Sequence, residues 1–325
     1  MKISFNPDFP GSSFLGYSPF LSEFSDKYSD IRFSSLKSDS LKVAELLQLG
    51  YQQFSHPRLK NWSDRIYRCS PSLWFRDNNS GFKLRESAFC KVRLCPICSA
   101  RKSAMWKAKC LQIWPLLTSE HPHLRYLFLT LTIKNVPVVN LKNVIVRLLR
   151  PSIKRFFRLL SYRLGDTFQG RIRKFECTYS SKRYCHPHYH YLLAVSPEYF
   201  DEFYLRFEEW RSLWQQSLRS DYKPLINIQA VSSDDEKGLL EVLKYELKPS
   251  DFKKDYRWLS EFGLQVSGTK IYSTGGILRK YFQFLEHDPD MIHEADINDN
   301  HAYGISNNLI RFDFNQSAKQ YCIFS

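Results

Sequence analysis

Two strand-like runs joined by a short connection place the strongest constraint on the fold. The first run, RIRKFECTYS, covers residues 171–180, and the second, HYHYLLAV, covers residues 188–195. Parallel neighbours need a crossover of a dozen or more residues, usually a helix, whereas antiparallel neighbours can be joined by a turn. The connection between these runs leaves no room for a helix, so they are predicted to pair as an antiparallel hairpin.

The flanking pattern extends this hairpin into a sheet. Further elements are predicted as a strand at 124–134, a basic helix at 141–164 interrupted near Pro151, a helix at 197–218 opening with Pro197, a strand at 225–231, and a helix at 232–249. The order β-α-β-β-α-β-α favours an α+β fold, with a central antiparallel sheet flanked by helices, over a doubly wound parallel sheet.

The chain is strongly basic and has the hydrophobic content of a globular protein. Its 47 Lys and Arg outnumber 33 Asp and Glu, which gives a net charge of +14, and 43% of its residues are hydrophobic. Such a charge excess predicts a polyanionic partner. The apolar run at 126–133 is far shorter than the roughly 20 residues that span a bilayer. The N-terminus shows no signal-peptide pattern, so we expect a cytoplasmic protein without membrane contact.

Composition divides the chain into four predicted parts. They are a Ser-rich, flexible or irregular N-terminal arm at 1–40, a cysteine-rich module at 41–120, the sheet-forming domain at 121–285, and an acidic linker with a C-terminal segment at 286–325. The last part contains a short strand-like run, LIRFDFN.

Four of the eight cysteines are spaced as metal ligands. Cys95 and Cys98 form a Cys-x2-Cys pair, Cys90 lies just upstream, and Cys69 can complete a four-thiolate site. Four thiolates suit a structural Zn²⁺ in a closed tetrahedral shell. Unrelated buried thiols are the alternative, and the assignment of Cys69 stays open.

Basic side chains on two predicted helices, together with one histidine, are candidates for DNA contact. They are Arg101, Lys102 and Lys107 in the helix at 101–114, Arg155 and Arg158 in the helix at 141–164, and His186 at the edge of the second hairpin strand. For the helix at 101–114, an ordinary solvated face is the alternative.

Two histidines share one face of the second hairpin strand. His188 and His190 point the same way because side chains alternate along a strand, and Glu176 on the partner strand can reach both rings. Two histidines and one carboxylate with open positions suit a divalent ion such as Mg²⁺ or Mn²⁺. Ordinary surface histidines are the alternative.

The helix at 232–249 carries a reactive pattern. Glu241, Tyr245 and Lys248 follow i, i+4, i+7 and share one helical face, opposite a stripe of leucines. Tyr245 is therefore predicted to point outward from a buried helix, with a plain solvent-exposed tyrosine as the alternative. A second Tyr-x-x-Lys, Tyr179 to Lys182, falls in the hairpin turn, where no helix places it.

Together these motifs resemble those of the HUH endonucleases. FLTLTIKN at 128–135, HPHYHYLLAV at 186–195 and the helical Tyr-x-x-Lys occur in the order found in that superfamily. The cysteine cluster, Arg101, and Glu241 four residues before Tyr245 are more narrowly similar to the plasmid rolling-circle replication initiators, the Rep family. The resemblance implies that the part at 121–285 is an HUH endonuclease domain.

The resemblance also implies an activity. Such a protein nicks one strand of a single-stranded or cruciform replication origin through a 5′-phosphotyrosine, here at Tyr245, with help from Lys248 and from the catalytic ion. It can rejoin the ends, and Glu241 is expected to act as general base for a terminating hydrolysis. A host helicase and a host polymerase are the expected partners.

Three other functions fit parts of the pattern. A non-catalytic zinc-containing DNA-binding regulator would use the cysteines and the charge. A metal-dependent phosphodiesterase would activate water and leave Tyr245 incidental. An HUH-type transposase would form the same covalent adduct, although such transposases usually lack a cysteine module. A covalent protein–DNA adduct separates the first two from a Rep-type activity.

Overall fold

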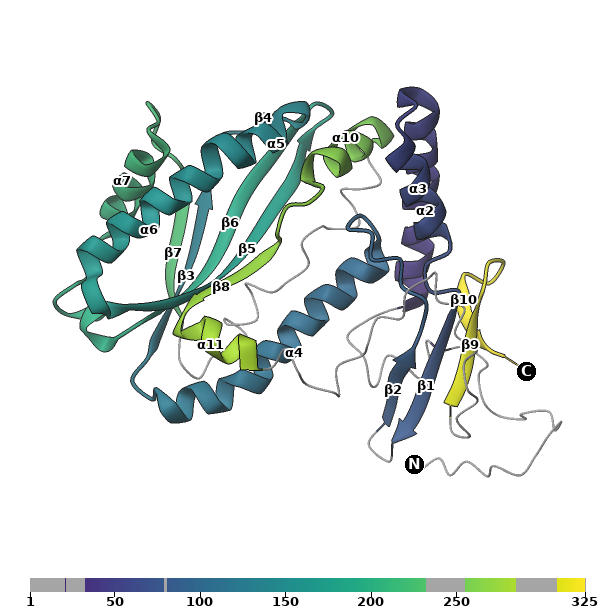
Figure 1. Cartoon of the computed structure of the whole chain (residues 1–325), viewed down its shortest axis with the longest axis horizontal. Coiled ribbons are helices and arrows are strands. Elements are labelled where there is room, and N and C mark those ends of the chain that lie inside the picture. The colour runs from purple at the N-terminus through teal and green to yellow at the C-terminus, as the bar shows by residue number, and fades with distance from the viewer. Residues whose placement is uncertain (1–20, 22–32, 79–80, 232–254, 285–308, 325) are drawn as a thin grey trace.

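The computed structural model describes residues 21, 33–78, 81–231, 255–284 and 309–324 (Figure 1). The larger sheet consists of β3 (Arg125–Thr132), β4 (Val136–Pro137), β5 (Phe168–Ser181), β6 (Tyr184–Val195), β7 (Ile226–Val231) and β8 (Tyr272–Gly276). Its order is β7-β3-β6-β5-β8 with β4 beside β6, and the described pairings are all antiparallel. The predicted α+β fold is confirmed.

The predicted hairpin lies at the centre of this sheet. β5 and β6 are joined by a tight turn at residues 182–183 and pair along almost their whole length. The register sets Glu176 opposite His188 and Lys174 opposite His190. Because directly paired residues share a face, these four polar side chains lie on one side of the sheet.

In the described part of the chain, helices pack around the larger sheet and at one end of a second, smaller sheet (Figure 1). In chain order they are α2 (Phe33–Phe54), α3 (Pro57–Tyr67), α4 (Pro96–Glu120), α5 (Leu141–Asn143), α6 (Arg150–Leu164), α7 (Phe207–Leu218), α10 (Tyr256–Val266) and α11 (Ile277–Phe284), with the short 3₁₀ turns η1 (Val138–Asn140), η3 (Gly165–Thr167) and η4 (Pro197–Phe200) and a π-helical segment, η2 (Val144–Leu149). None of the described helices combines the length and apolar character needed to cross a membrane.

One face of the larger sheet is covered by α6 and α7 (Figure 1). The Phe157 ring of α6 packs 5.0 Å from the Tyr191 ring of β6. The Trp214 indole of α7 donates a hydrogen bond to the Thr132 carbonyl at the end of β3, at 2.8 Å. Tyr189 and Tyr191 therefore point into this core, as predicted for the residues that alternate with the histidines.

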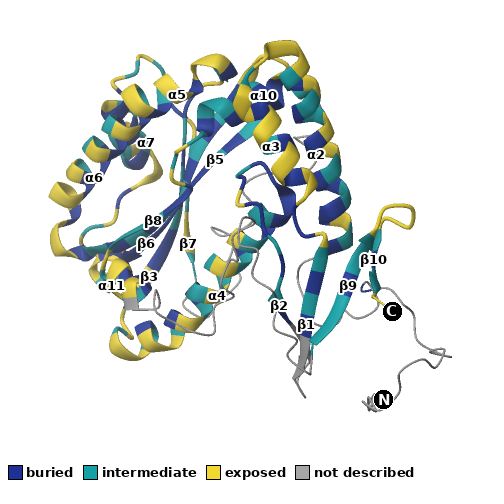
Figure 2. Cartoon of the chain, turned by 45° about the vertical axis from the view of Figure 1, so that its right-hand side comes forward, coloured by how far each residue is buried: buried dark blue, intermediate teal, exposed yellow. Residues whose placement is uncertain are grey.

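The opposite face is packed at one end by α4 and α11. Leu192 and Ala194 of β6 join Leu117 of α4 in a second hydrophobic core, and the strands between the two cores are largely buried (Figure 2). His188 and His190 lie on this same face, further toward the start of β6. The two cores thus fix which side of the sheet receives the histidines.

The smaller sheet joins segments that lie far apart in the sequence. It has the order β10-β9-β1-β2 and consists of β1 (Ser72–Asn78), β2 (Gly81–Glu86), β9 (Leu309–Asn315) and β10 (Gln320–Ile323). β9 pairs antiparallel with β1, so the C-terminal strand-like run lies in the sheet of the cysteine module. Tyr321 secures this arrangement, because its hydroxyl donates to the Ser70 carbonyl at 2.6 Å and its N–H donates to the Ser34 hydroxyl at 3.1 Å.

The helix predicted to open with Pro197 begins ten residues later. Pro197 opens only the turn η4, and α7 begins at Phe207. The reason is local capping, since the Arg206 N–H donates to the Glu209 carboxylate at 2.9 Å. The prediction of one continuous helix from residue 197 is therefore wrong in its start.

The interruption predicted near Pro151 is absent. Residues 141–164 are helical throughout, and Pro151 lies in the first turn of α6. The π-helical segment η2 precedes Pro151. The backbone hydrogen-bond pattern of the helix therefore changes before Pro151, which has no N–H to donate. Elsewhere, residues 33–40, assigned to the N-terminal arm, form the start of α2. The sequence pattern predicts none of β1, β2 and β8.

Candidate metal centres

The structure brings Glu176, His188 and His190 together on the larger sheet. Their ligand atoms all lie within 4.8 Å of one another. His190 Nε2 is 3.2 Å from Glu176 Oε2, and His188 Nε2 is 3.9 Å from the same oxygen. Three donor atoms that face one point, from two adjacent strands, form an arrangement that can hold one divalent ion.

The other nitrogen of each imidazole is held by a neighbour. His188 Nδ1 donates to the His186 carbonyl at 3.1 Å, so its Nε2 is left with a lone pair. His190 Nδ1 lies 3.0 Å from the Thr130 hydroxyl of β3, and the Phe128 ring stacks on His190 with centroids 5.6 Å apart. Such contacts orient ligands before an ion binds. The FLTLTIKN motif therefore supports His190 from the adjacent strand.

The electrostatics of the site suit a metal. Burial raises the pKa of the Glu176 carboxyl, but hydrogen bonding to His190 and the charge of Lys174 lower it more, to about 2. Burial, and then the neighbouring His190, lower the pKa of His188 to about 4. At neutral pH the group is therefore an ionised carboxylate beside a neutral imidazole, the protonation states that metal ligands require.

Lys174 is part of this site, and the sequence pattern did not identify it. The residue is 1% exposed, and its Nζ lies 3.1 Å from Glu176 Oε2. Lys174 stands two residues before Glu176 on β5, so strand alternation alone places it on the same face. A buried lysine at this spacing fixes the carboxylate in position. His186 lies beside the cluster and outside it, with Nδ1 2.9 Å from the Asn135 side-chain oxygen.

The predicted nucleophile, Tyr245, lies outside the described residues, as do Glu241 and Lys248. The competing tyrosine, Tyr179, is described. Its ring lies 5.3 Å from Trp258 of α10, in the core on the face of the sheet opposite the histidines. The Tyr-x-x-Lys of the hairpin turn is thus directed away from the ligand cluster.

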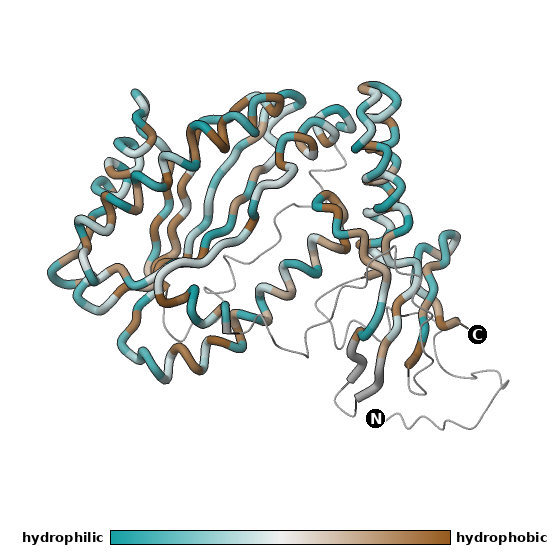
Figure 3. Tube along the Cα trace, in the orientation of Figure 1, coloured by the Kyte–Doolittle hydropathy of each residue, from teal (hydrophilic) through white to brown (hydrophobic). Residues whose placement is uncertain are grey.

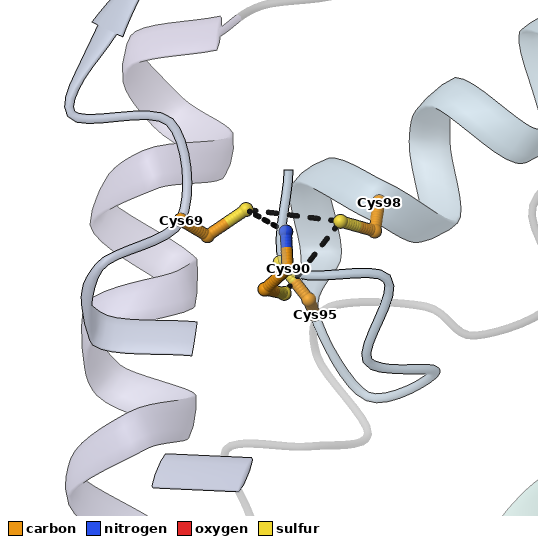
Figure 4. Close-up of side chains that lie close together, drawn as sticks. All are labelled: Cys69, Cys90, Cys95 and Cys98. Carbon is orange, nitrogen blue, oxygen red and sulfur yellow. Dashed lines mark hydrogen bonds between the residues drawn. The ribbon is translucent and has the colours of Figure 1, made fainter. Parts of the chain in front are cut away.

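The four predicted zinc ligands also converge (Figure 4). Cys69 follows α3, Cys90 follows β2, Cys95 immediately precedes α4, and Cys98 lies in the first turn of α4. Their sulfur atoms lie within 4.8 Å of one another. Cys69, left open by the sequence, is the fourth member of the cluster.

The sulfur geometry fits a tetrahedral zinc. Cys98 Sγ is 3.7 Å from Cys69 Sγ and 3.6 Å from Cys90 Sγ. A tetrahedron with Zn–S bonds of about 2.3 Å has edges of about 3.8 Å, close to both separations. Hydrogen bonds from the other cysteines, first that of Cys90, hold the pKa of the Cys69 thiol well below its usual range. The donor set suits a closed, structural Zn²⁺ site.

A buried cation lies beside the cysteines. Lys37 of α2 is 4% exposed and donates to the carbonyl oxygens of Cys69 and Tyr67 at 2.5 and 2.9 Å. Ser40, on the same helix, lies 3.7 Å from Cys95 Sγ. Four thiolates around one Zn²⁺ would carry net negative charge, which a buried ammonium beside the Cys69 backbone and a hydroxyl beside Cys95 Sγ would help to offset.

The basic residues of α4 differ in their surroundings. The Arg101 guanidinium stacks 3.4 Å from the centroid of the Phe89 ring. Lys102 is exposed and Lys107 is half-buried. Arg101 therefore has a packing role beside the cysteine loop, whereas Lys102 is open to a ligand.

The basic residues of α6 lie on the face of the sheet away from the histidines. Arg155 is half-buried and donates to the Ser217 carbonyl at 2.8 Å, while Arg158 is exposed. The predicted contact residues Arg155 and Arg158 thus belong to a surface separate from that of the Glu176 cluster.

Comparison with known proteins identifies the family. A family model described as "Replication protein" matches residues 81–322, well over half of the chain. "Protein rep" of Streptococcus pneumoniae serotype 2 is 32% identical over 282 residues, which cover 82% of this chain and 84% of that protein. "Protein rep" of Lactiplantibacillus plantarum is 32% identical over 248 residues, covering 70% and 77%.

A third relative, "Protein rep" of Lentilactobacillus hilgardii, is 29% identical over 279 residues, covering 80% of this chain and 85% of that protein. No solved structure shows significant similarity to the chain. The matched region includes the ligand cluster of β5 and β6 and three of the four clustered cysteines. The chain therefore belongs to the Rep family of plasmid rolling-circle replication initiators.

Proposed function

We propose that this initiator nicks and rejoins one strand of its replicon's origin through Tyr245, with a divalent ion, Mg²⁺ or Mn²⁺, at the Glu176 cluster. The observation that carries the proposal is the convergence of Glu176, His188 and His190 within 4.8 Å on one sheet face. A non-catalytic DNA-binding regulator has no use for such a cluster. Family membership supports DNA as the substrate.

The chemistry begins with a phosphodiester of single-stranded DNA at the cluster. A bound divalent ion would polarise a non-bridging phosphate oxygen. The Tyr245 oxygen attacks phosphorus, and the new P–O bond of a 5′-phosphotyrosine forms as the bond to the 3′ oxygen breaks. The phenolic proton, whose pKa is normally near 10, leaves the tyrosine, and the departing 3′ oxygen takes up a proton. The free 3′-hydroxyl can then prime a host polymerase on a strand opened by a host helicase.

The residues around the nucleophile divide the remaining work. Lys248, one turn from Tyr245 on the predicted helix, stabilises the phenolate or positions the scissile phosphate. Because the phosphotyrosine keeps the energy of the cleaved bond, the same site can rejoin ends. Glu241 activates water for the hydrolysis that ends a round of replication. Lys174 holds the Glu176 carboxylate in place through the 3.1 Å ion pair.

The cysteine cluster has a separate role in this proposal. Cys69, Cys90, Cys95 and Cys98 would hold a Zn²⁺ as four protein ligands, and the ion would tie α3, β2 and α4 together. It therefore supplies structure to the upstream module and takes no part in the cleavage.

A denaturing gel tests the proposal. Purified protein is mixed with Mn²⁺ and labelled single-stranded oligonucleotides that tile the replicon encoding the chain. We expect a 5′ fragment that ends in a free 3′-hydroxyl, and a labelled band in which the 3′ fragment is linked to the protein through its 5′ phosphate. Cleavage without the linked band would favour a phosphodiesterase that activates water, and no cleavage of any oligonucleotide would favour a regulator.

A further inference from the structure

The helical segment at 141–164 carries an unusual charge pattern. It contains seven Lys and Arg and no Asp or Glu. Four of these residues, Arg147, Arg150, Lys154 and Arg158, are exposed and follow one another at intervals of three or four residues. Residues at these intervals share one side of a helix. They are called the cationic ridge below.

The ridge faces away from the larger sheet. The buried side of α6, including Phe156, Phe157 and Leu160, packs into the core beneath Tyr191. Hydrophobic and hydrophilic residues accordingly alternate along α6 (Figure 3), and the outer side of the helix is exposed (Figure 2). Since the histidines lie on the other face of the sheet, the ridge and the Glu176 cluster are on opposite sides of the domain.

The charges of the ridge are not balanced by carboxylates. Among the described residues, none of its four members makes an ion pair, whereas the neighbouring helix α7 pairs its acids: Glu209 with Arg163 at 2.8 Å and Glu208 with Arg211. Arg219, at the end of α7, adds another exposed cation nearby. The pKa of Arg155 is lowered, first by partial desolvation and then by the charges of Arg219 and Arg158. Cations this close repel one another unless an anion lies between them.

The dimensions of the ridge match a phosphate backbone. Eleven helical steps separate Arg147 from Arg158, which is about 16 Å at 1.5 Å per residue. One strand of duplex DNA places about five phosphates along that length. Four cations spaced along it can each meet a phosphate without reading any base.

The surface lacks the features of other binding modes. Only Val146 and Tyr162 are exposed large hydrophobic residues of this segment, so it has no apolar centre of the kind that protein interfaces bury. Single-stranded DNA is held by a cationic groove together with several aromatic side chains on which successive bases stack, and this segment exposes a single aromatic side chain, Tyr162.

From the charge, the length and the position, we infer that the cationic ridge binds the backbone of a duplex DNA segment while the Glu176 cluster handles the single strand on the other face. The inference rests on the proposed function and adds a second DNA surface to it. Contact along the ridge is independent of sequence, so it raises the time that the initiator spends on its replicon without altering the choice of nick site.

The test uses the full chain with four ridge substitutions, Arg147→Gln, Arg150→Gln, Lys154→Gln and Arg158→Gln. Fluorescence anisotropy measures affinity for a duplex that lacks the nick site, over a range of salt concentrations. Each lost phosphate contact should lower the slope of log affinity against log salt by about 0.9, or about 3.6 for all four. Nicking of a short single-stranded oligonucleotide should remain unchanged.

Two control proteins separate ridge contact from general charge. The first carries four substitutions of exposed residues at or near α2 and α3: Lys42→Gln, Arg58→Gln, Lys60→Gln and Arg68→Gln. They remove the same net charge as the ridge substitutions. The salt slope of this control should stay near that of the wild type. The second replaces the three ridge arginines with lysine and should keep the slope, which also shows that a loss is not a folding defect.

Equal salt slopes for the ridge variant and the first control would overturn the inference. An acidic protein would then be the candidate partner for the cationic ridge. Failure of the wild-type chain to form a covalent adduct would count against the proposed function instead. The first failure is read by anisotropy on duplex DNA and the second on a denaturing gel with single-stranded DNA, so they are distinguishable.

Discussion

Changing Cys98 to serine tests whether the cysteine cluster holds a structural zinc. Cys98 Sγ lies 3.7 and 3.6 Å from the sulfurs of Cys69 and Cys90, the spacing of ligands on one tetrahedral ion. Structural zinc sites contribute about 10–16 kcal/mol of binding free energy. An even division over four ligands gives about 3 kcal/mol for Cys98, a large part of the 5–15 kcal/mol that typically separates folded from unfolded domains.

This loss should be visible as a lower melting temperature. For a unit of about 150–250 residues, 1 kcal/mol corresponds to about 2–4 °C, so Cys98→Ser should lower Tm by about 6–12 °C. Elemental analysis should find about one zinc per wild-type chain and much less in the variant. Cys322→Ser is the matched control, because Cys322 is half-buried on β10 and outside the cluster.

The result that would refute the reasoning is specific. A wild-type chain without zinc, or a Cys98→Ser chain that keeps both its zinc and its Tm, would show that the cluster is a set of buried thiols. A loss of Tm that a chelator does not reproduce in the wild type would point to packing of Cys98 rather than to metal.

Four further substitutions separate the roles of individual residues. His188→Ala or His190→Ala should abolish nicking in Mn²⁺ but leave duplex affinity largely intact, since phosphate contacts elsewhere supply most binding; nicking at the normal rate on a gel would mean that the ion binds elsewhere. Glu241→Ala should keep the first cleavage and lower terminating hydrolysis by about 10²-fold; equal losses in single-turnover nicking and in termination would make Glu241 structural. Lys174→Met removes the cation 3.1 Å from Glu176, so the pKa of that carboxyl should rise above about 2 in a ¹³C NMR titration; an unchanged pKa would contradict the ion pair.

The hairpin and its polar face could be predicted because they follow from local pattern. A two-residue period decides which side chains share a face, and a short connection allows only antiparallel pairing. The sequence pattern therefore predicts that Glu176 and His188 belong to one site. Lys174 obeys the same period, but lysine is rarely buried, so its place beside Glu176 was not expected.

The strand β8, and the pairing of the predicted run LIRFDFN with β1, depend on contacts that no local pattern reveals. β9 lies beside β1 although most of the chain separates them, and loop length says nothing about such pairing. β8 ends in Gly275 and Gly276, which indicate a turn by composition. Gly276 has φ +63°, and a Cβ there would lie 2.2 Å from the Gln169 carbonyl. The glycine is needed for close approach to β5, and the strand exists because of that contact.

The start of α7 shows how one hydrogen bond can move a boundary. Pro197 has the φ value favoured at the start of a helix, and it does open a 3₁₀ turn. The side chain of Glu209 nevertheless caps the backbone at Arg206, so α7 begins at Phe207, ten residues from the predicted start. This capping box is local, since Glu209 lies three residues after Arg206, but the proline at residue 197 was the stronger start signal in the sequence.

Peptide mapping of the covalent adduct tests the central claim most directly. The chain is incubated with Mn²⁺ and an oligonucleotide containing the nick site, the DNA is trimmed with nuclease, and the protein is digested and analysed by mass spectrometry. We expect a nucleotide-bearing peptide with the added mass on Tyr245, and no such peptide from Tyr245→Phe. A phosphotyrosine at Tyr179 or at any other residue, or an adduct that persists in Tyr245→Phe, would contradict the account.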